Sequence, residues 1–123
     1  MGRAAPVFVV DDDETVADGL VMLLTANGYT ARSFPSAEAF LADRDTASWH
    51  CGLVDVQLPG MDGLALAETL HAQGAPPPQL LVMTGRVTSA VEQRAATAGL
   101  PPVLPKPLDM PEVLAAIRSA FAA

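Results

Sequence analysis

Cysteine is almost absent from this 123-residue chain, which contains only Cys51. A single cysteine cannot form an intramolecular disulfide, and it leaves no cysteine cluster for a zinc site. Long hydrophobic runs are missing as well. The apolar run near the N-terminus, residues 4–10, contains a proline and meets acidic residues at 11–14. A membrane span needs about 20 apolar residues, and a secretory signal ends in small residues, so we expect a cytoplasmic protein with no membrane contact.

Basic residues are scarce. Seven lysines and arginines stand against fourteen aspartates and glutamates, which gives a formal net charge of −7 and a pI near 4.5. Such a field repels phosphate backbones, so we expect no nucleic-acid binding through this domain. The same charge favours binding of metal cations.

Aromatic residues make up only 5% of the chain, yet half of all residues are hydrophobic and the mean hydropathy is +0.31. A core built from alanine, valine and leucine can therefore form, and intrinsic disorder is excluded. The length predicts a single domain that covers residues 1–123.

Short apolar runs alternate with longer segments of helical period, which is typical of β-α units around a parallel sheet. The pattern occurs five times, with strands predicted at residues 7–10, 29–34, 51–54, 80–83 and 103–104. Prolines at positions 101, 102, 105 and 107 confine the last strand to an edge of the sheet, because a central strand needs its N–H groups.

Local signals place the helices between these strands. Asn27 and Gly28 end the first helix, Ser36 and Asp62 cap the second and third, and residues 89–98 form the fourth. Residues 44–50 are predicted to form a loop, and Gly74 with the prolines at 76–78 stops the third helix. The last helix is expected to begin after Asp109, to carry Pro111 in its first turn, and to bury Val113, Leu114, Ile117 and Phe121.

Polar side chains stand where the predicted strands end. Asp11 and Asp12 follow the first strand, Asp55 the third, Thr84 the fourth and Lys106 the fifth. Parallel strands lie about 4.8 Å apart and end at one rim, where ligands of open α/β sheets bind. Three carboxylates at one spot disfavour one another's ionisation, and a magnesium ion resolves that conflict with the oxygen ligands it prefers.

Each of these residues also has a simpler interpretation. An acidic run after a strand is often a solvated helix N-terminus, a lone threonine can cap a helix, and a lone lysine is usually a surface residue. What favours the functional interpretation is the combination, because four features occur in chain order on four strand ends.

The combination resembles the receiver domain of two-component response regulators over essentially the whole chain. Four motifs carry the resemblance: Val9-Val10-Asp11-Asp12-Asp13-Glu14, Val54-Asp55-Val56-Gln57-Leu58-Pro59-Gly60-Met61-Asp62-Gly63, Met83-Thr84-Gly85 and Pro105-Lys106-Pro107. Residues 36–41, Ser-Ala-Glu-Ala-Phe-Leu, resemble the FixJ branch, whose receivers often precede a DNA-binding domain. The resemblance implies an α/β, flavodoxin-like (βα)5 three-layer sandwich with a parallel five-stranded sheet in the order 2-1-3-4-5.

The resemblance also implies the chemistry. Asp55 would accept a phosphoryl group from the phosphohistidine of a sensor histidine kinase or phosphotransfer protein. Asp12 would bind Mg2+ directly, Asp11 through water, and the backbone carbonyl of Gln57 would join Asp55 in the ligand set. Such a domain is no conventional enzyme, although it catalyses its own phosphorylation and dephosphorylation. It would switch conformation to control an output domain or a homodimer partner.

Further roles follow from the same resemblance. Lys106 would pair with a phosphoryl oxygen, and its peptide bond to Pro107 would be cis. Thr84 would turn its hydroxyl to the phosphoryl group and pull the following loop inward. Gln57 and Arg86 occupy positions that tune the access of water.

One departure from the family concerns the output surface. The family usually carries an aromatic residue three positions before the lysine, where this chain has Val103. The residues also allow comparison with two other functions. A haloacid-dehalogenase-like small phosphatase needs a second aspartate two residues after the first, and Gln57 occupies that position. A pseudo-receiver that acts without phosphorylation would not need the intact Asp12, Asp55, Thr84 and Lys106.

Overall fold

A computed structural model describes residues 6–43, 49–73 and 78–122. Within these ranges five strands and five helices alternate, and the strands form one parallel sheet in the order β2-β1-β3-β4-β5. This is the flavodoxin-like architecture that the resemblance to receiver domains implied. The elements are β1 (Pro6–Val10), α1 (Glu14–Ala26), β2 (Thr30–Phe34), α2 (Ala37–Asp43), β3 (Cys51–Asp55), α3 (Gly63–Ala72), β4 (Gln79–Thr84), α4 (Ser89–Thr97), β5 (Leu104–Pro105) and α5 (Met110–Ala122).

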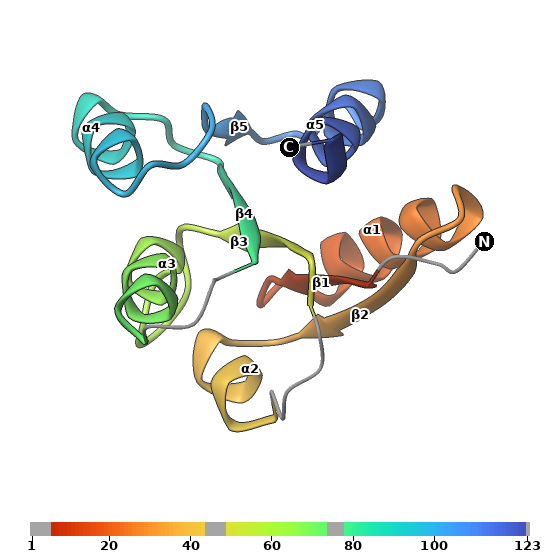
Figure 1. The fold of residues 1–123 in the computed structure, drawn as a ribbon, viewed down its shortest axis with the longest axis horizontal. Coiled ribbons are helices and arrows are strands. Elements are labelled where there is room, and N and C mark those ends of the chain that lie inside the picture. Colours follow the sequence, from red (N-terminus) through yellow and green to blue (C-terminus); the bar gives the residue numbers. More distant parts are fainter. Residues whose placement is uncertain (1–5, 44–48, 74–77, 123) are drawn as a thin grey trace.

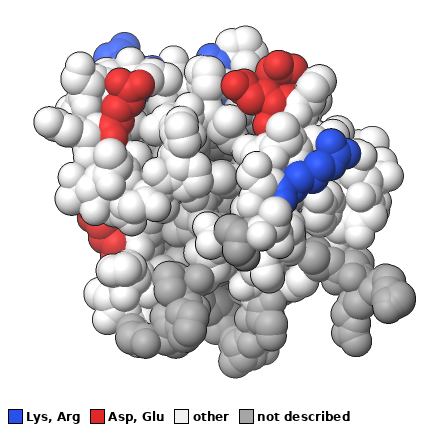
Figure 2. All heavy atoms as spheres, turned by 45° about the horizontal axis from the view of Figure 1, so that its top comes forward, with Lys and Arg blue, Asp and Glu red and all other residues white. Residues whose placement is uncertain are grey.

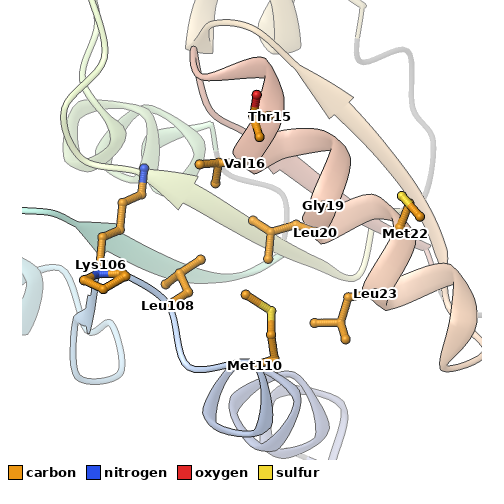
Figure 3. Close-up of a pocket in the computed structure, with 10 residues that line it drawn as sticks. Thr15, Val16, Gly19, Leu20, Met22, Leu23, Lys106, Leu108 and Met110 are labelled. Carbon is orange, nitrogen blue, oxygen red and sulfur yellow. The ribbon is translucent and has the colours of Figure 1, made fainter.

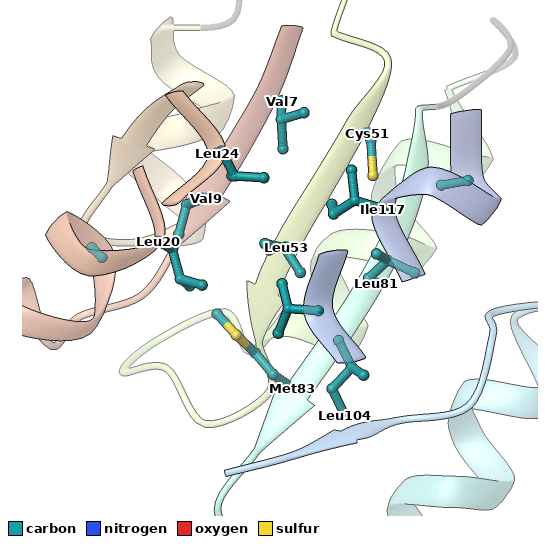
Figure 4. Close-up of a cluster of buried hydrophobic side chains, with 13 residues drawn as sticks. Val7, Val9, Leu20, Leu24, Cys51, Leu53, Leu81, Met83, Leu104 and Ile117 are labelled. Carbon is teal, nitrogen blue, oxygen red and sulfur yellow. The ribbon is translucent and has the colours of Figure 1, made fainter. Parts of the chain in front are cut away.

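The helices cover both faces of the sheet. Figure 1 shows α1 and α5 on one side and α2, α3 and α4 on the other. Alternation along the strands divides the side chains between the two layers, because successive residues point to opposite faces. Val7 and Val9 pack with α1 and α5 around Leu53 and Ile117 (Figure 4), whereas Phe8 and Val10 pack under α2 and α3.

The few aromatic residues are concentrated at one place. Phe8 of β1 stacks on Phe40 of α2 with ring centroids 4.0 Å apart, and Phe34 and Trp49 contact the same Phe40 ring edge-on or tilted. Aromatic pairs of this kind add about 0.5–1.5 kcal/mol beyond the area that they bury. The short helix α2 is therefore fixed firmly to the sheet.

Most of the predicted helix ends are confirmed. Asn27 is the C-cap of α1, and Gly28 after it has a φ of 93°. The Ser36 hydroxyl accepts a hydrogen bond from the Ala39 N–H, and an Asp62 carboxylate oxygen accepts one from the Ala65 N–H. Helix α5 begins at Met110, and the Asp109 carbonyl accepts the Val113 N–H. The structure does not describe residues 44–48 of the predicted loop. It also does not describe residues 74–77, which include Gly74 and two of the prolines predicted to end the third helix.

Two details of the prediction were wrong. The fifth strand comprises Leu104 and Pro105 rather than residues 103–104, and Pro105 is aligned with Thr84 of β4. A proline is tolerated there because β5 pairs on only one side. On α5 the buried residues are Val113, Ile117 and Ala120, whereas Leu114 and Phe121 are half-buried. They lie roughly a quarter of a helical turn from the line that faces the sheet.

None of the helices in the described ranges is long and apolar enough to cross a bilayer.

Candidate functional site

The carboxyl ends of the strands bring three polar side chains into the protein interior. Asp11 directly follows β1, Asp55 ends β3 and Thr84 ends β4, and their exposed fractions are only 2%, 5% and 0%. The parallel register aligns Val10 with Val54 and Asp55 with Met83, so these residues stand at the same rim of the sheet. The sequence prediction that they share one edge is therefore confirmed.

Lys106 joins two of these residues. Its Nζ lies 2.8 Å from Oδ2 of Asp11 and 2.9 Å from Oδ2 of Asp55. The Lys106 N–H donates to the Thr84 carbonyl, which fixes the start of this segment against β4, and the Lys106–Pro107 peptide bond is cis. Lys106 is the only lysine in the chain. It is thus the cation that meets the two buried carboxylates.

The protonation of this cluster follows from burial and charge. Burial raises the pKa of Asp55, and hydrogen bonds from Lys106 and from the Gln57 N–H only partly oppose that effect. Burial alone would lower the pKa of Lys106, but the bonds to Asp11 and Asp55 outweigh it and raise the pKa. The lysine is therefore protonated at neutral pH, and its positive charge compensates one negative charge of the carboxylate cluster.

The acidic residues are arranged so that they can hold a cation. One carboxylate oxygen from each of Asp11, Asp12 and Asp55 lies within 4.8 Å of the others, and Asp12 is the exposed member. The Gln57 N–H donates to Oδ1 of Asp55 at 2.9 Å, so a local turn directly after β3 holds this carboxylate oxygen. A set of carboxylate oxygens that faces solvent on one side fits Mg2+, which keeps several waters.

Thr84 is at the rim, but its hydroxyl is engaged elsewhere. Its Oγ1 accepts the Arg86 N–H at 3.1 Å and donates to the Arg86 carbonyl at 3.3 Å. This hydroxyl therefore holds the loop between β4 and α4 rather than Asp55 or Lys106. Gly85 follows without a side chain, and a Cβ there would lie 3.9 Å from the amide oxygen of Gln57.

Two side chains near the site were missed by sequence reasoning. Glu38 of α2 accepts the Met61 N–H at 2.8 Å, and Arg94 of α4 contacts Asp62 and Glu68 through three hydrogen bonds of 3.0–3.2 Å. Both contacts span more than 20 positions in the chain, so no local pattern could reveal them. The only signal was Glu38 within the segment that resembles the FixJ branch.

An open apolar groove of about 750 Å³ lies beside the cluster, between α1 and the segment that leads into α5. Figure 3 shows Leu20 and Leu23 of α1 opposite Leu108 and Met110, with Lys106 at one end of the groove. Met22, on its rim, has an exposed fraction of 72%. The groove therefore offers a hydrophobic surface that adjoins the charged site.

Figure 2 shows one face of the molecule, on which basic side chains are sparse. The basic side chains on this face are few and stand apart, and white, uncharged residues cover most of it. This face carries no continuous basic patch among the residues described, in agreement with the net charge of −7.

Comparison with known proteins identifies the family. The profile of the response regulator receiver domain matches residues 7–118. The transcriptional regulatory protein FixJ of Azorhizobium caulinodans is 35% identical over 121 residues, which are 98% of this chain and 57% of FixJ. The response regulator protein TodT of Pseudomonas putida is 31% identical over 119 residues, 97% of this chain and 52% of TodT. The chain thus spans about half the length of these curated relatives.

A solved structure gives the same result. A putative response regulator from Chloroflexus aurantiacus J-10-fl superposes with a TM-score of 0.90 at 26% identity, and the match covers 98% of this chain and all of that one. The phosphatase and pseudo-receiver alternatives are not favoured by these matches. The chain belongs to the response regulator receiver domain family, the phosphoacceptor modules of two-component systems.

Proposed function

We propose that Asp55 is the residue that accepts the phosphoryl group, and that residues 1–123 form one receiver domain which uses Mg2+ for this reaction. The observation that carries the assignment is the position of Asp55. Asp55 ends the central strand β3, so it stands between Asp11, which follows β1, and Thr84, which ends β4. Lys106 contacts both Asp11 and Asp55, but of these two only Asp55 has this middle position in the cluster. Asp11, Asp12, Asp55 and the Gln57 carbonyl would hold the ion, which supplies positive charge to offset that of the phosphoryl oxygens.

The chain's own residues prepare the carboxylate for attack. One Asp55 oxygen forms a bond to phosphorus as the bond from phosphorus to the histidine nitrogen of the donor breaks, and the imidazole leaves with the electron pair of that bond. Gln57 holds Oδ1 and Lys106 holds Oδ2 of Asp55, so the carboxylate is oriented before the reaction. After transfer the Lys106 ammonium pairs with a phosphoryl oxygen.

Thr84 connects this chemistry to the loop that follows it. Its hydroxyl now bonds only to the Arg86 backbone among the contacts described. A phosphoryl group on Asp55 offers a charged acceptor, which forms stronger hydrogen bonds than a neutral carbonyl. We expect the hydroxyl to turn toward that group and to release the Arg86 backbone, so that residues 85–88 rearrange.

The test is phosphorylation by a small-molecule donor. Incubation with acetyl phosphate and Mg2+ should add one phosphoryl group per chain, measured by intact-protein mass. The same incubation with excess chelator should leave the mass unchanged. Equal labelling with and without Mg2+ would contradict the metal requirement, and no labelling in either case would contradict the phosphoacceptor function.

Mg2+ should also stabilise the folded protein. A ligand that binds only the folded state adds about 2.7 kcal/mol at one hundred times its Kd, which raises the Tm by several degrees. Asp12→Ala removes an exposed ligand without disturbing the Lys106 contacts. We expect this variant to lose most of the Mg2+ response and to be slightly more stable than the parent without metal, because one like charge is gone.

Thermal melts of both proteins in chelator and in millimolar Mg2+ measure this effect. An unchanged parent Tm in Mg2+ would contradict the site, and an undiminished response in Asp12→Ala would exclude Asp12 as a ligand.

The donor protein is a sensor histidine kinase or a phosphotransfer protein in this proposal. A protein donor must bring its phosphohistidine to Asp55, and the apolar groove between α1 and α5 reaches the site at Lys106. Hydrophobic grooves of this kind accept amphipathic helices, and exposed methionines such as Met22 adapt to different partners. The groove supports docking of the donor on this side.

The output side of the module has a valine at position 103, where the family resemblance leads us to expect an aromatic residue. Val103 is half-buried and packs against the cluster of Val82 and Ala95 between the sheet and α4. A valine has one restricted χ angle and cannot make the large rotation of an aromatic ring. We propose that the signal passes through residues 84–89 to an output domain or a homodimer partner in the cytoplasm.

Backbone amide shifts test this route. Between the metal-free protein and its beryllofluoride–Mg2+ complex, we expect the largest changes at residues 85–89 and small changes at Val103 and Leu104. Dominant changes at Val103 and Leu104, with none at residues 85–89, would show that the proposed route is wrong.

A further inference from the structure

The segment between β3 and α3, residues 56–62, follows Asp55 directly and carries Gln57. We call it the β3–α3 loop. Its first half is held by the site itself, because the Gln57 N–H donates to Asp55 and the buried Leu58 packs into the core under α2 and α3. Its second half contains the exposed Pro59 and Gly60 and is reached from outside by one acidic side chain, Glu38.

Glu38 approaches this half of the loop at two neighbouring residues, Gly60 and Met61. Its Oε2 accepts the Met61 N–H at 2.8 Å. The same carboxylate lies against Gly60, where a Cβ would approach Oε2 to 2.5 Å. Gly60 has a φ of +74°, in the left-handed region that favours glycine, so the turn presents bare backbone to the carboxylate. The hydrogen bond also lowers the pKa of Glu38, which keeps it ionised at neutral pH.

Glu38 extends from a rigid support. It is in the first turn of α2, between Ala37 and Phe40, which have exposed fractions of 0% and 1%. Phe40 is stacked on Phe8 of the central strand β1. The backbone of Glu38 is therefore fixed relative to the sheet that also carries Asp11 and Asp55, and its exposed side chain reaches the Met61 N–H from there.

We propose that Glu38 is a positioning residue of the phosphoacceptor site, which holds the β3–α3 loop so that the Gln57 carbonyl remains directed at the bound Mg2+. The proposal rests on the metal site of the proposed function. It adds Glu38 to that site as a residue that is not itself a metal ligand. Glu38 touches neither the metal nor the phosphoryl group. It acts through Gly60 and Met61, and it gives a function to the segment that resembles the FixJ branch.

Two variants separate the hydrogen bond from the charge. Glu38→Gln keeps an acceptor oxygen for the Met61 N–H, whereas Glu38→Ala removes it, and both remove the same negative charge. A titration with MgCl2, followed by the amide signal of Gln57, gives the Kd of each protein. We expect Glu38→Ala to bind Mg2+ roughly three- to tenfold more weakly than Glu38→Gln, the effect of one charge-independent hydrogen bond.

A second measurement needs no metal. Exchange of the Met61 amide with water, measured by NMR in chelator, should be several-fold faster in Glu38→Ala than in the parent and close to the parent in Glu38→Gln. A purely structural role of Glu38 in α2 would instead change the Tm of both variants without separating their Mg2+ affinities.

Equal Kd values for the alanine and glutamine variants would overturn the proposal. A parent protein that binds no Mg2+ would overturn the proposed metal site itself. A parent that binds Mg2+ while Glu38→Ala matches its Kd would overturn only the assignment of Glu38.

Discussion

Replacement of Asp55 by asparagine should reduce phosphorylation by acetyl phosphate to background. The amide has no negative charge and is a poor nucleophile, and the substitution also removes one anionic partner of Lys106 and one proposed ligand of Mg2+. Its size is nearly unchanged, so the buried position between the strand ends stays filled. Intact-protein mass after incubation with acetyl phosphate and Mg2+ measures the loss.

A matched control comes from an aspartate outside the site. Asp43 at the end of α2 is exposed and pairs with Arg32 at 2.6 Å. Asp43→Asn makes the same chemical change and should be labelled like the parent. Full labelling of Asp55→Asn would mean that another side chain accepts the phosphoryl group.

Replacement of Lys106 by methionine should lower the free energy of unfolding by about 1–3 kcal/mol in chelator. Removal of one partner from a buried ion pair typically costs about 3–5 kcal/mol, and the partial exposure of Lys106 reduces that figure. Methionine preserves the length of the side chain, so the loss reflects Asp11 and Asp55 left without their cation. Urea denaturation in chelator measures the difference, and equal stability of the two proteins would contradict the role of the ion pairs.

The stability that Lys106 contributes should also depend on pH. The pKa of Lys106 is raised above its ordinary value of 10.5, so the folded protein holds this proton more tightly than the unfolded chain. The stability from Lys106 is then complete below pH 10.5 and is lost as the pH rises through the pKa of the folded state. We expect the difference in free energy of unfolding between the parent and Lys106→Met to shrink as the pH rises through that pKa. A difference that grows there would contradict a raised pKa of Lys106 in the folded protein.

Mg2+ should stabilise both proteins, and Lys106→Met by more than the parent. In Lys106→Met the carboxylates of Asp11 and Asp55 have no ammonium to displace or compete with, so the metal should stabilise this variant more than the parent. A smaller Mg2+ response in the variant would show that Lys106 assists metal binding.

The sequence alone determined the order and type of the elements. Runs such as residues 7–10 and 80–83 are apolar without interruption because their strands are covered on both faces. The helix ends could also be located, because Ser36 and Asp62 each bond to a backbone N–H three residues away. These signals are local, so they remain readable before the chain is folded.

Weak local signals left other features to the tertiary structure. Prolines obscured the β5 boundary, and only pairing with Met83 and Thr84 showed that the strand comprises Leu104 and Pro105. On α5 the helical period allowed several apolar residues to face the sheet. Packing selected Ala120 over Leu114, because the orientation of a helix about its axis depends on the neighbours that it meets.

The residues of the site were predictable, and their contacts were not. Parallel strands end at one rim, so Asp11, Asp55, Thr84 and Lys106 had to gather there. Lys106 lies 95 residues from Asp11 and 51 residues from Asp55 along the chain. Its ion pairs depend on side-chain directions that are fixed only when the sheet and helices pack. The same holds for the bonds of Thr84 to Arg86 and for the contact of Glu38 with Met61, because the rotamer of a side chain responds to neighbours that are distant in the chain.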